Sequence, residues 1–339
     1  TAPSYSFTGS AIARTVYFKV RREFRESAVV SDTIYLAPAA LSVGAGSFQM
    51  GRPYTDEGWS NERPVHTVTL NAFTIGVYEV TSQQYADVLN WADDQGYLTD
   101  SAGGAYTGGH VYAYGRPIAS SGGQIAYADG VFAPRMRPNG LGTTTHSMAE
   151  HPMVTVSWYG AAAFCNWLSE MVGLAPCYNT ATWARISPLP GGYRLPTEAE
   201  WERAAAWDHV AYTHWRYGIS SEIIAHNLAN YYTHPYAWSN PLGLRQVPYT
   251  SPAGWYSGVS PRGAYDMAGN AWEWCHDWAF RTYSTDPVNN PTGPATGTAR
   301  LLRGGSWNSD SDSCRAARRF SATPDTLNNT YGFRISQTP

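Results

Sequence analysis

Lysine is nearly absent from this chain of 339 residues: Lys19 is the only one, so arginine carries almost all of the positive charge. Charged residues make up only 14% of the sequence, and the formal net charge is −3. This balance lacks the basic footprint that nucleic-acid binding requires, so we expect no nucleic-acid partner. Because a guanidinium is a planar fork of donors, charge dominated by arginine favours fixed, hydrogen-bonded roles that hold loops in place.

Cysteine and long apolar runs are also scarce. Cys165, Cys177, Cys275 and Cys314 form no C-x-x-C pair, so a structural zinc site is not expected, and a single disulfide of unassigned pairing is compatible with the count. No apolar run reaches the roughly 20 residues of a membrane-spanning helix, so we expect no direct membrane insertion. The sequence opens at Thr1 without a methionine. The missing methionine suggests a processed or trimmed chain.

Apolar and turn-forming residues are abundant instead. Hydrophobic residues make up 43% of the chain, which also has 32 glycines and 22 prolines. This composition predicts a large packed core with many turns and irregular loops. The 14 tryptophans and 24 tyrosines fit either a loop-rich aromatic core or an aromatic recognition surface, and we favour the core for most of them.

Local patterns divide the chain into an N-terminal β-rich segment, residues 1–36, and one domain, residues 37–339. Alternating residues predict strands at 13–22, 29–36, 65–70 and 73–80. Thr81 and Thr197 open capping boxes, which predict helices to about Trp91 and Trp207, and Ser157 caps a helix through Met171. Residues 96–150 show little periodicity and are predicted to be a long ordered insertion. After Trp207 we predict mostly loops.

Seven short motifs occur in a fixed order along the chain. They are FQMG at 48–51, EVTSQQY at 79–85, HPMV at 151–154, YRLPTEAEWE at 193–202, DMAGNAWEW at 266–274, RGGSW at 303–307 and GFR at 332–334. Together they resemble the formylglycine-generating-enzyme (sulfatase-modifying-factor) family over about residues 40–336. The resemblance implies an α+β fold of the C-type-lectin-like type, loop-rich and low in regular secondary structure.

The same resemblance raises the question of catalysis. It implies that the family's enzymes, which oxidise a cysteine of a sulfatase, need a copper-binding cysteine pair after the RGGSW motif. Counted from Arg303, Ser309 takes the first cysteine position and Cys314 the second, whereas a count back from residues 315–319 matches neither cleanly. Copper(I) needs two soft thiolates close together. We therefore predict no copper and no enzymatic activity; the alternative is an oxidase or related enzyme with an atypical metal site.

Residues 308–331, hereafter the C-terminal segment, have an unusual composition. They are dense in Ser, Asp, Asn, Thr, Arg and Ala and contain no Lys, Gln, Glu, Met or Trp. With their flanking motifs they resemble the variable region of proteins diversified by retroelements, in which the varied side chains form the binding site. The resemblance implies a receptor or adhesin-like, non-catalytic protein, expected as a monomer, that binds an unidentified protein or surface ligand. It also implies a secreted or cell-surface protein, which we expect to be lipid-anchored through a segment upstream of residue 1.

The predicted ligand-binding residues all lie in the C-terminal segment. They are Ser309, Asp310, Asp312, Ser313, Arg318, Phe320, Ser321, Ala322, Thr323, Asp325, Thr326, Thr330 and Tyr331. Phe320 and Tyr331 are the expected anchors, because exposed aromatic side chains contribute disproportionately to binding. For each small residue the alternative is an ordinary solvated loop position. Arg303, Arg315, Arg319 and Arg334 are predicted to form buried hydrogen bonds rather than ligand contacts.

Two further groups of residues have alternative interpretations. Asp266, Gly269, Ala271 and Glu273 match the family's calcium-binding positions, so the resemblance implies a structural Ca²⁺ there, which carboxylate and carbonyl oxygens suit. The alternative is a tight turn in which Asp266 caps and Glu273 pairs with an arginine. Asp277 beside His276 is a weak indication of catalysis, and a histidine satisfied within the core is favoured.

Overall fold

The computed structural model describes residues 38–339 except 56–57, 101–105, 107–109, 121, 139–143, 234–236, 239–241 and 245–246. Before residue 38 it describes only the backbone of four short strands. Of these, β1 (Ala13–Phe18) pairs antiparallel with β4 (Val30–Tyr35), and β2 (Arg21–Arg22) pairs with β3 (Arg25–Glu26). These pairings confirm strands in the two N-terminal stretches predicted from alternation.

Three helices begin at the caps predicted from the sequence. Helix α1 (Ser82–Asp94) and helix α3 (Glu198–Ala206) each open with a complete capping box, at Thr81 and Thr197. Helix α2 (Trp158–Met171) begins after Ser157, whose hydroxyl accepts from the Gly160 amide. Because these signals are local, the sequence placed the start of each helix correctly.

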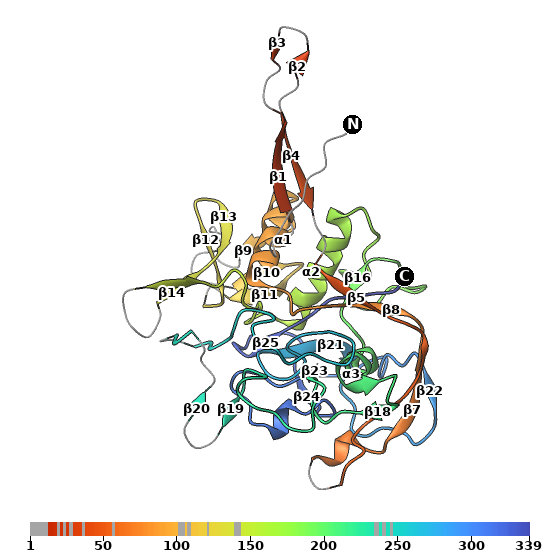
Figure 1. The fold of residues 1–339 in the computed structure, drawn as a ribbon. Coiled ribbons are helices and arrows are strands. Elements are labelled where there is room, and N and C mark those ends of the chain that lie inside the picture. The colour runs from red at the N-terminus through yellow and green to blue at the C-terminus, as the bar shows by residue number, and fades with distance from the viewer. Residues whose placement is uncertain are drawn as a thin grey trace.

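Outside residues 96–150, three small sheets in the described part of the chain have three or four strands. The first has the order β16 (Tyr193–Arg194), β26 (Ser336–Gln337), β8 (Phe73–Gly76), β5 (Ala40–Val43). The second has the order β24 (Phe320–Ala322), β23 (Arg300–Arg303), β21 (Trp272–Trp278), β25 (Tyr331–Gly332), and the third has the order β22 (Val288–Asn289), β7 (His66–Leu70), β6 (Gly46–Met50). In Figure 1 the second sheet lies below α1 and α2, with α3 beside it. The C-terminal segment therefore joins a sheet through its own strand, β24.

The stretch at 96–150 contains more regular structure than predicted. Its strands are β9 (Thr99–Asp100), β10 (His110–Ala113), β11 (Arg116–Ser120), β12 (Ile125–Ala128), β13 (Val131–Pro134), β14 (Met136–Pro138) and β15 (Thr145–Ser147). Asn90 of α1 exchanges two hydrogen bonds, of 2.9 and 2.7 Å, with the backbone of Phe132 in β13. The remaining short pairs are β17 (Trp207–Asp208) with β18 (Thr213–His214), and β19 (Tyr232–Thr233) with β20 (Ala237–Trp238).

Aromatic residues fill the interior, as predicted for most of them. Trp158, Trp167, Trp201 and Trp274 are among the largest fully buried side chains. The four cysteines are free and buried. No helix in the described part of the chain combines the length and the apolar character needed to cross a membrane.

Candidate functional site

Four buried arginines hold the C-terminal segment and its flanks against the rest of the domain. Arg303 donates to Glu198 at 3.1 Å, to Glu202 and to the carbonyl of Ala316 at 2.7 Å. Arg319 donates to both oxygens of Glu198, at 2.6 and 3.1 Å. Burial raises the pKa of Glu202, but the charge of Arg303 and the hydrogen bonds from His214 and the Gly51 amide together outweigh burial and lower this pKa to about 2. Both glutamates belong to α3, so this helix fixes the sheet strand β23 and the segment that follows it.

The other two arginines make equivalent contacts. Arg315 binds Glu62 through two hydrogen bonds of 2.6 and 3.0 Å. Arg334 binds Glu273 through two bonds of 2.6 Å and donates to the carbonyl of Gly76 at 2.9 Å. These contacts confirm that the four arginines are buried hydrogen-bonding residues. We call Arg303, Arg315, Arg319, Arg334 and their glutamate partners the arginine frame.

Most of the predicted binding residues lie outside this frame and reach solvent. Asp310, Phe320, Ser321, Thr323 and Asp325 are exposed, and Asp312, Ser313, Arg318, Ala322, Thr326 and Thr330 are half-buried. The segment is therefore a surface whose side chains are largely not part of the core.

Two of the predicted residues are buried, which corrects their expected placement. Ser309 is 8% exposed, and its hydroxyl accepts from the Ser306 amide at 3.0 Å. Tyr331 is 7% exposed and meets the Trp274 ring edge-on, with the centroids 5.4 Å apart. Both positions lie next to the flanking motifs, where the chain enters and leaves the core. The expectation that Tyr331 is an exposed anchor is therefore wrong.

Phe320 is the aromatic residue that the surface does present. Its side chain is 39% exposed, and its ring lies 5.3 Å from the ring of Trp272, which is buried. Strand β24 holds it in register, because Phe320 pairs with Leu302 of β23. An aromatic side chain supported from below in this way has little conformational freedom to lose on binding.

Trp59 joins the same surface from a distant loop. It is 56% exposed, its indole donates to Asp312 at 3.3 Å, and the Arg318 guanidinium lies 4.5 Å above its ring. Sequence reasoning missed this residue because it lies 253 positions before Asp312 and has no motif around it.

The turn out of β23 depends on a glycine. Gly305 has φ +79°, and a Cβ there would lie 2.6 Å from the Sγ of Cys314. Cys314 is fully buried, and burial raises the pKa of its thiol. The other position predicted to replace the family's cysteine pair, Ser309, has its hydroxyl beside Ser306 at 3.1 Å.

The calcium positions have contacts that match the alternative of a tight turn. Glu273 accepts from Trp201 at 2.7 Å in addition to its two bonds from Arg334, so both of its oxygens are occupied. Asp266, at φ +57°, accepts from the Gly254 amide at 2.6 Å, and Ala271 donates to Glu79 at 2.9 Å. The residues therefore fit a Ca²⁺ ion poorly. Among the residues that the structure describes, no cluster of three or more acidic, histidine or cysteine side chains could hold a metal.

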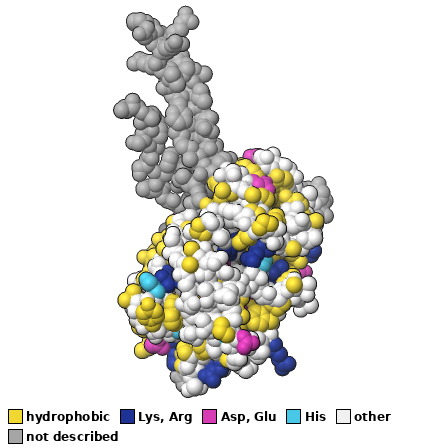
Figure 2. All heavy atoms as spheres, turned by 90° about the vertical axis from the view of Figure 1, so that its right-hand side faces the viewer, with side chains coloured by type: hydrophobic (Ala, Val, Ile, Leu, Met, Phe, Trp, Pro, Cys, Tyr) yellow, Lys and Arg dark blue, Asp and Glu magenta, His cyan; other side chains and the backbone are white. Residues whose placement is uncertain are grey.

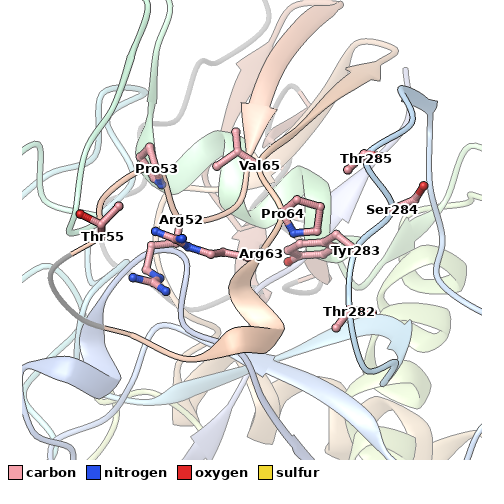
Figure 3. Close-up of a pocket in the computed structure, with 10 residues that line it drawn as sticks. All are labelled: Arg52, Pro53, Thr55, Arg63, Pro64, Val65, Thr282, Tyr283, Ser284 and Thr285. Atoms are coloured by element: carbon pink, nitrogen blue, oxygen red, sulfur yellow. The ribbon is translucent and has the colours of Figure 1, made fainter.

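An open pocket of about 790 Å³ borders the arginine frame, since it is lined by Arg52, which lies 3.4 Å from Glu62, and by Tyr283, whose hydroxyl donates to Glu198 at 3.2 Å. Figure 3 shows Arg52 and Arg63 on one side and Tyr283 on the other, with Pro64 between them and near the tyrosine ring. Both arginines donate to the carbonyl of Tyr54, at 3.0 and 2.7 Å.

On the face in Figure 2, basic and acidic side chains are few and scattered among uncharged ones.

The fold and site together define a loop-rich α+β protein of the C-type-lectin-like type, with an exposed C-terminal surface on a buried arginine frame. The family model described as sulfatase-modifying factor enzyme 1-like domain matches residues 26–339. The chain belongs to this family.

Individual relatives carry different names. The chain is 32% identical to a formylglycine-generating enzyme of Streptomyces coelicolor, over 86% of each chain. It is 30% identical to a serine/threonine-protein kinase pkn1 of Chlamydia pneumoniae over 87% of its own length, but it spans only 37% of that relative. Among solved structures, Treponema denticola variable protein 1 matches with a TM-score of 0.60 and 25% identity, covering 96% of this chain and 99% of the other.

The comparisons contradict one prediction made from the sequence, on enzymatic activity, and confirm those on fold class and on resemblance to a variable protein. The prediction that the chain is not an enzyme is contradicted, because several relatives, including those of Streptomyces coelicolor and Thermomonospora curvata, are named formylglycine-generating enzyme. The predicted fold class is confirmed by the solved structures that match. The resemblance to a variable protein is also confirmed by one of them.

Proposed function

We propose that this chain is a ligand-binding member of its family, in which the C-terminal segment forms the binding surface for a protein or other surface ligand. One observation carries the proposal. The segment exposes Phe320 and its polar neighbours, while the buried arginine frame holds the backbone through other residues.

The physical argument rests on the separation between surface and frame. Loop positions on a rigid scaffold tolerate substitution without loss of the fold. A preordered surface also loses less conformational entropy when it binds. Phe320, partly exposed over Trp272, is the proposed anchor, and Trp59 extends the surface beyond the segment.

We further propose that the segment is diversified and that the protein is secreted or displayed at the cell surface. The likeness to a solved variable protein supports this part of the proposal. Sequencing the locus in several isolates tests it, with the exposed stretch 209–213 as a surface control. We expect variation to concentrate at the exposed positions of the C-terminal segment. Equal variation in both regions would be ordinary surface drift and would refute diversification.

Binding itself is tested with two displayed libraries selected on hen egg-white lysozyme. One library varies Asp310, Phe320, Ser321, Thr323 and Asp325, and the other varies the five residues 209–213. We expect specific binders from the first library and a lower yield from the second. Equal yields would show that the C-terminal segment has no special fitness for binding.

The names of the relatives favour a second candidate, an oxidase with an atypical metal site. Cys314 would supply its only thiolate in the C-terminal segment, and burial opposes thiolate formation there. Titration with copper(I) tests this candidate, with Cys314→Ser as the control. Tight copper uptake that is lost in Cys314→Ser would support the enzyme, and no uptake would remove it.

A further inference from the structure

A second pocket, of about 420 Å³, takes none of its lining from the C-terminal segment. It lies between the loop at 184–189, the end of β21, the loop at 292–295 and the start of β23. Its polar lining consists of Arg185, Ser187, His276, Thr292 and Arg300. Its other walls are formed by Trp278 and by small apolar and aliphatic side chains, including Leu189 and Pro294. The volume is within the range of small-molecule sites.

Arg300 is held rigidly at the wall of this pocket. Its guanidinium carbon lies 3.7 Å from the ring centroid of Trp158 and 3.5 Å from that of Trp278, so two indoles sandwich it. Nη1 donates to the His276 carbonyl, and Nε is buried without a hydrogen-bond partner among the described atoms. The side chain is therefore a planar donor group with a fixed orientation and with bonding capacity left over.

Within the described part of the chain no carboxylate forms an ion pair with Arg300, although the charge of Asp277 acts on it from a greater distance and partly offsets the effect of burial on its pKa. Other deeply buried arginines do form such a pair: Arg194 binds Glu200 at 2.6 Å, and Arg334 binds Glu273 at the same distance. A buried charge without an ion-pair partner is unfavourable, because it has lost its hydration and gained no opposite charge. In agreement, burial lowers the pKa of Arg300 to about 10. An anion in the pocket would supply the missing partner.

Arg185 adds to the positive character of the pocket, and His276 adds a buried ring nitrogen. Arg185 is half-buried, and none of the described residues forms an ion pair or hydrogen bond with its side chain. Glu200, which lies nearby, already receives two bonds from Arg194, at 2.6 and 2.7 Å. His276 is 8% exposed, and its Nδ1 has no partner among the described atoms. Burial, and then the charges of Arg185 and Arg300, hold the pKa of His276 well below its usual value, so the ring is neutral.

We propose that this pocket binds a small organic carboxylate, with the carboxylate held by Arg300 and Arg185 and an apolar or aromatic body against Trp278 and Leu189. The planar fork of a stacked guanidinium matches a planar carboxylate. The apolar walls favour an organic ligand over a free inorganic ion.

Isothermal titration calorimetry with benzoate tests this assignment. Benzamide serves as the uncharged isostere and phenyl phosphate as the alternative oxyanion. We expect saturable binding of benzoate, no binding of benzamide and weaker binding of phenyl phosphate. Tighter binding of phenyl phosphate would overturn the carboxylate assignment, and absence of benzoate binding would overturn the site.

Two variants locate the binding within the pocket. Arg185→Gln removes a guanidinium from a half-buried loop position, and we expect at least about a tenfold loss of benzoate affinity. Arg281→Gln changes an exposed arginine outside the lining and should bind as the wild type does. Near-ultraviolet circular dichroism checks that both variants are folded. Unchanged affinity in a folded Arg185→Gln protein would refute the proposal.

Discussion

At the scale of single residues, buried charges are matched by contacts from distant parts of the chain. Glu62 is fully buried and accepts two bonds from Arg315, and Arg52 Nε lies 3.4 Å from the same carboxylate. The pair joins the loop before β7 to the C-terminal segment. Its contribution to stability depends on both partners, because removing one leaves a buried charge that is only partly compensated.

Replacing Arg315 with glutamine should therefore destabilise the fold strongly. We expect the free energy of unfolding to fall by about 3 kcal/mol, because Glu62 loses both of its hydrogen bonds from the Arg315 guanidinium. Urea denaturation measures the change. Asp325→Asn, at an exposed position, is the control and should stay within about 0.5 kcal/mol of wild type. A loss of similar size in both variants would contradict the importance of the buried pair.

Asp277 predicts a dependence of stability on pH. Burial, followed by the charge of Glu198, raises the pKa of Asp277 to about 7. The folded state therefore holds this proton more tightly than the unfolded chain, whose aspartate pKa is about 3.9. The stabilisation is fully present below about pH 4 and is lost as the pH rises through 7.

Asp277→Asn removes this titration while its amide oxygen can still accept from the Glu198 amide, which lies 2.9 Å from Asp277 Oδ2. Relative to wild type, the variant should gain about 2 kcal/mol of unfolding free energy between pH 5 and pH 8. Urea denaturation across that range measures it. Stability curves that stay parallel over the whole range would show that Asp277 is already ionised at pH 5.

At the scale of elements, α3 connects local sequence signals to the frame. Thr197 accepts from the Glu200 amide at 3.2 Å, and the Glu200 side chain accepts from the Thr197 amide at 2.9 Å. The first turn of this helix carries Glu198, and the second carries Glu202, which bind Arg303 and Arg319. The cap therefore also positions two carboxylates.

Thr197→Ala should lower the free energy of unfolding by about 1 kcal/mol, the usual contribution of an N-cap hydroxyl. Thr197→Ser keeps a hydroxyl and should recover most of the loss. Thermal unfolding followed by circular dichroism compares the three proteins. Equal losses in the alanine and serine variants would mean that packing of the threonine methyl, rather than the cap, is responsible.

How far the sequence predicts an element depends on how local its stabilising contacts are. The helices were predicted because Thr81, Ser157 and Thr197 bond within one turn. Strand β21 has seven residues but was missed, because the chain after Trp207 was predicted to be mostly loops and Glu273 was assigned to a calcium site or a tight turn. Its burial depends on Arg334, 61 residues away. No local pattern reveals such a partner.

In the candidate site too, features that depend on local sequence were predicted, and features that depend on distant contacts were not. The exposure of most of the C-terminal segment was predicted from its composition, which is polar and rich in small residues. The burial of Ser309 and Tyr331 was not, because it depends on contacts with Ser306 and Trp274. The contribution of Trp59 was likewise invisible, because only the fold brings it to Asp312.

At the scale of the whole molecule, metal binding would appear as a shift in the melting temperature. A ligand that binds only the folded state stabilises it by RT ln(1 + [L]/Kd), so excess ligand raises the melting temperature. Both oxygens of Glu273 are occupied by Arg334 and Trp201. We therefore expect the same melting temperature in excess Ca²⁺ and in EDTA. A melting temperature that EDTA lowers in wild type but not in Asp266→Asn would instead place Ca²⁺ at this turn.

The separation of surface and frame makes a quantitative prediction for the whole molecule. A variant that combines Asp310→Asn, Phe320→Tyr, Ser321→Asn, Thr323→Ser and Asp325→Asn changes five exposed side chains, and asparagine at 310 can still accept from the Ser313 amide. Because each exposed substitution usually costs no more than about 0.5 kcal/mol, the total loss should stay below about 2.5 kcal/mol. The single frame substitution Arg319→Gln should cost more, about 3 kcal/mol, because Arg319 is 2% exposed and binds both oxygens of Glu198. Urea denaturation of the two proteins measures both losses. If the five surface changes cost more than the one buried change, the exposed side chains of the C-terminal segment support the fold and are not free to vary for binding.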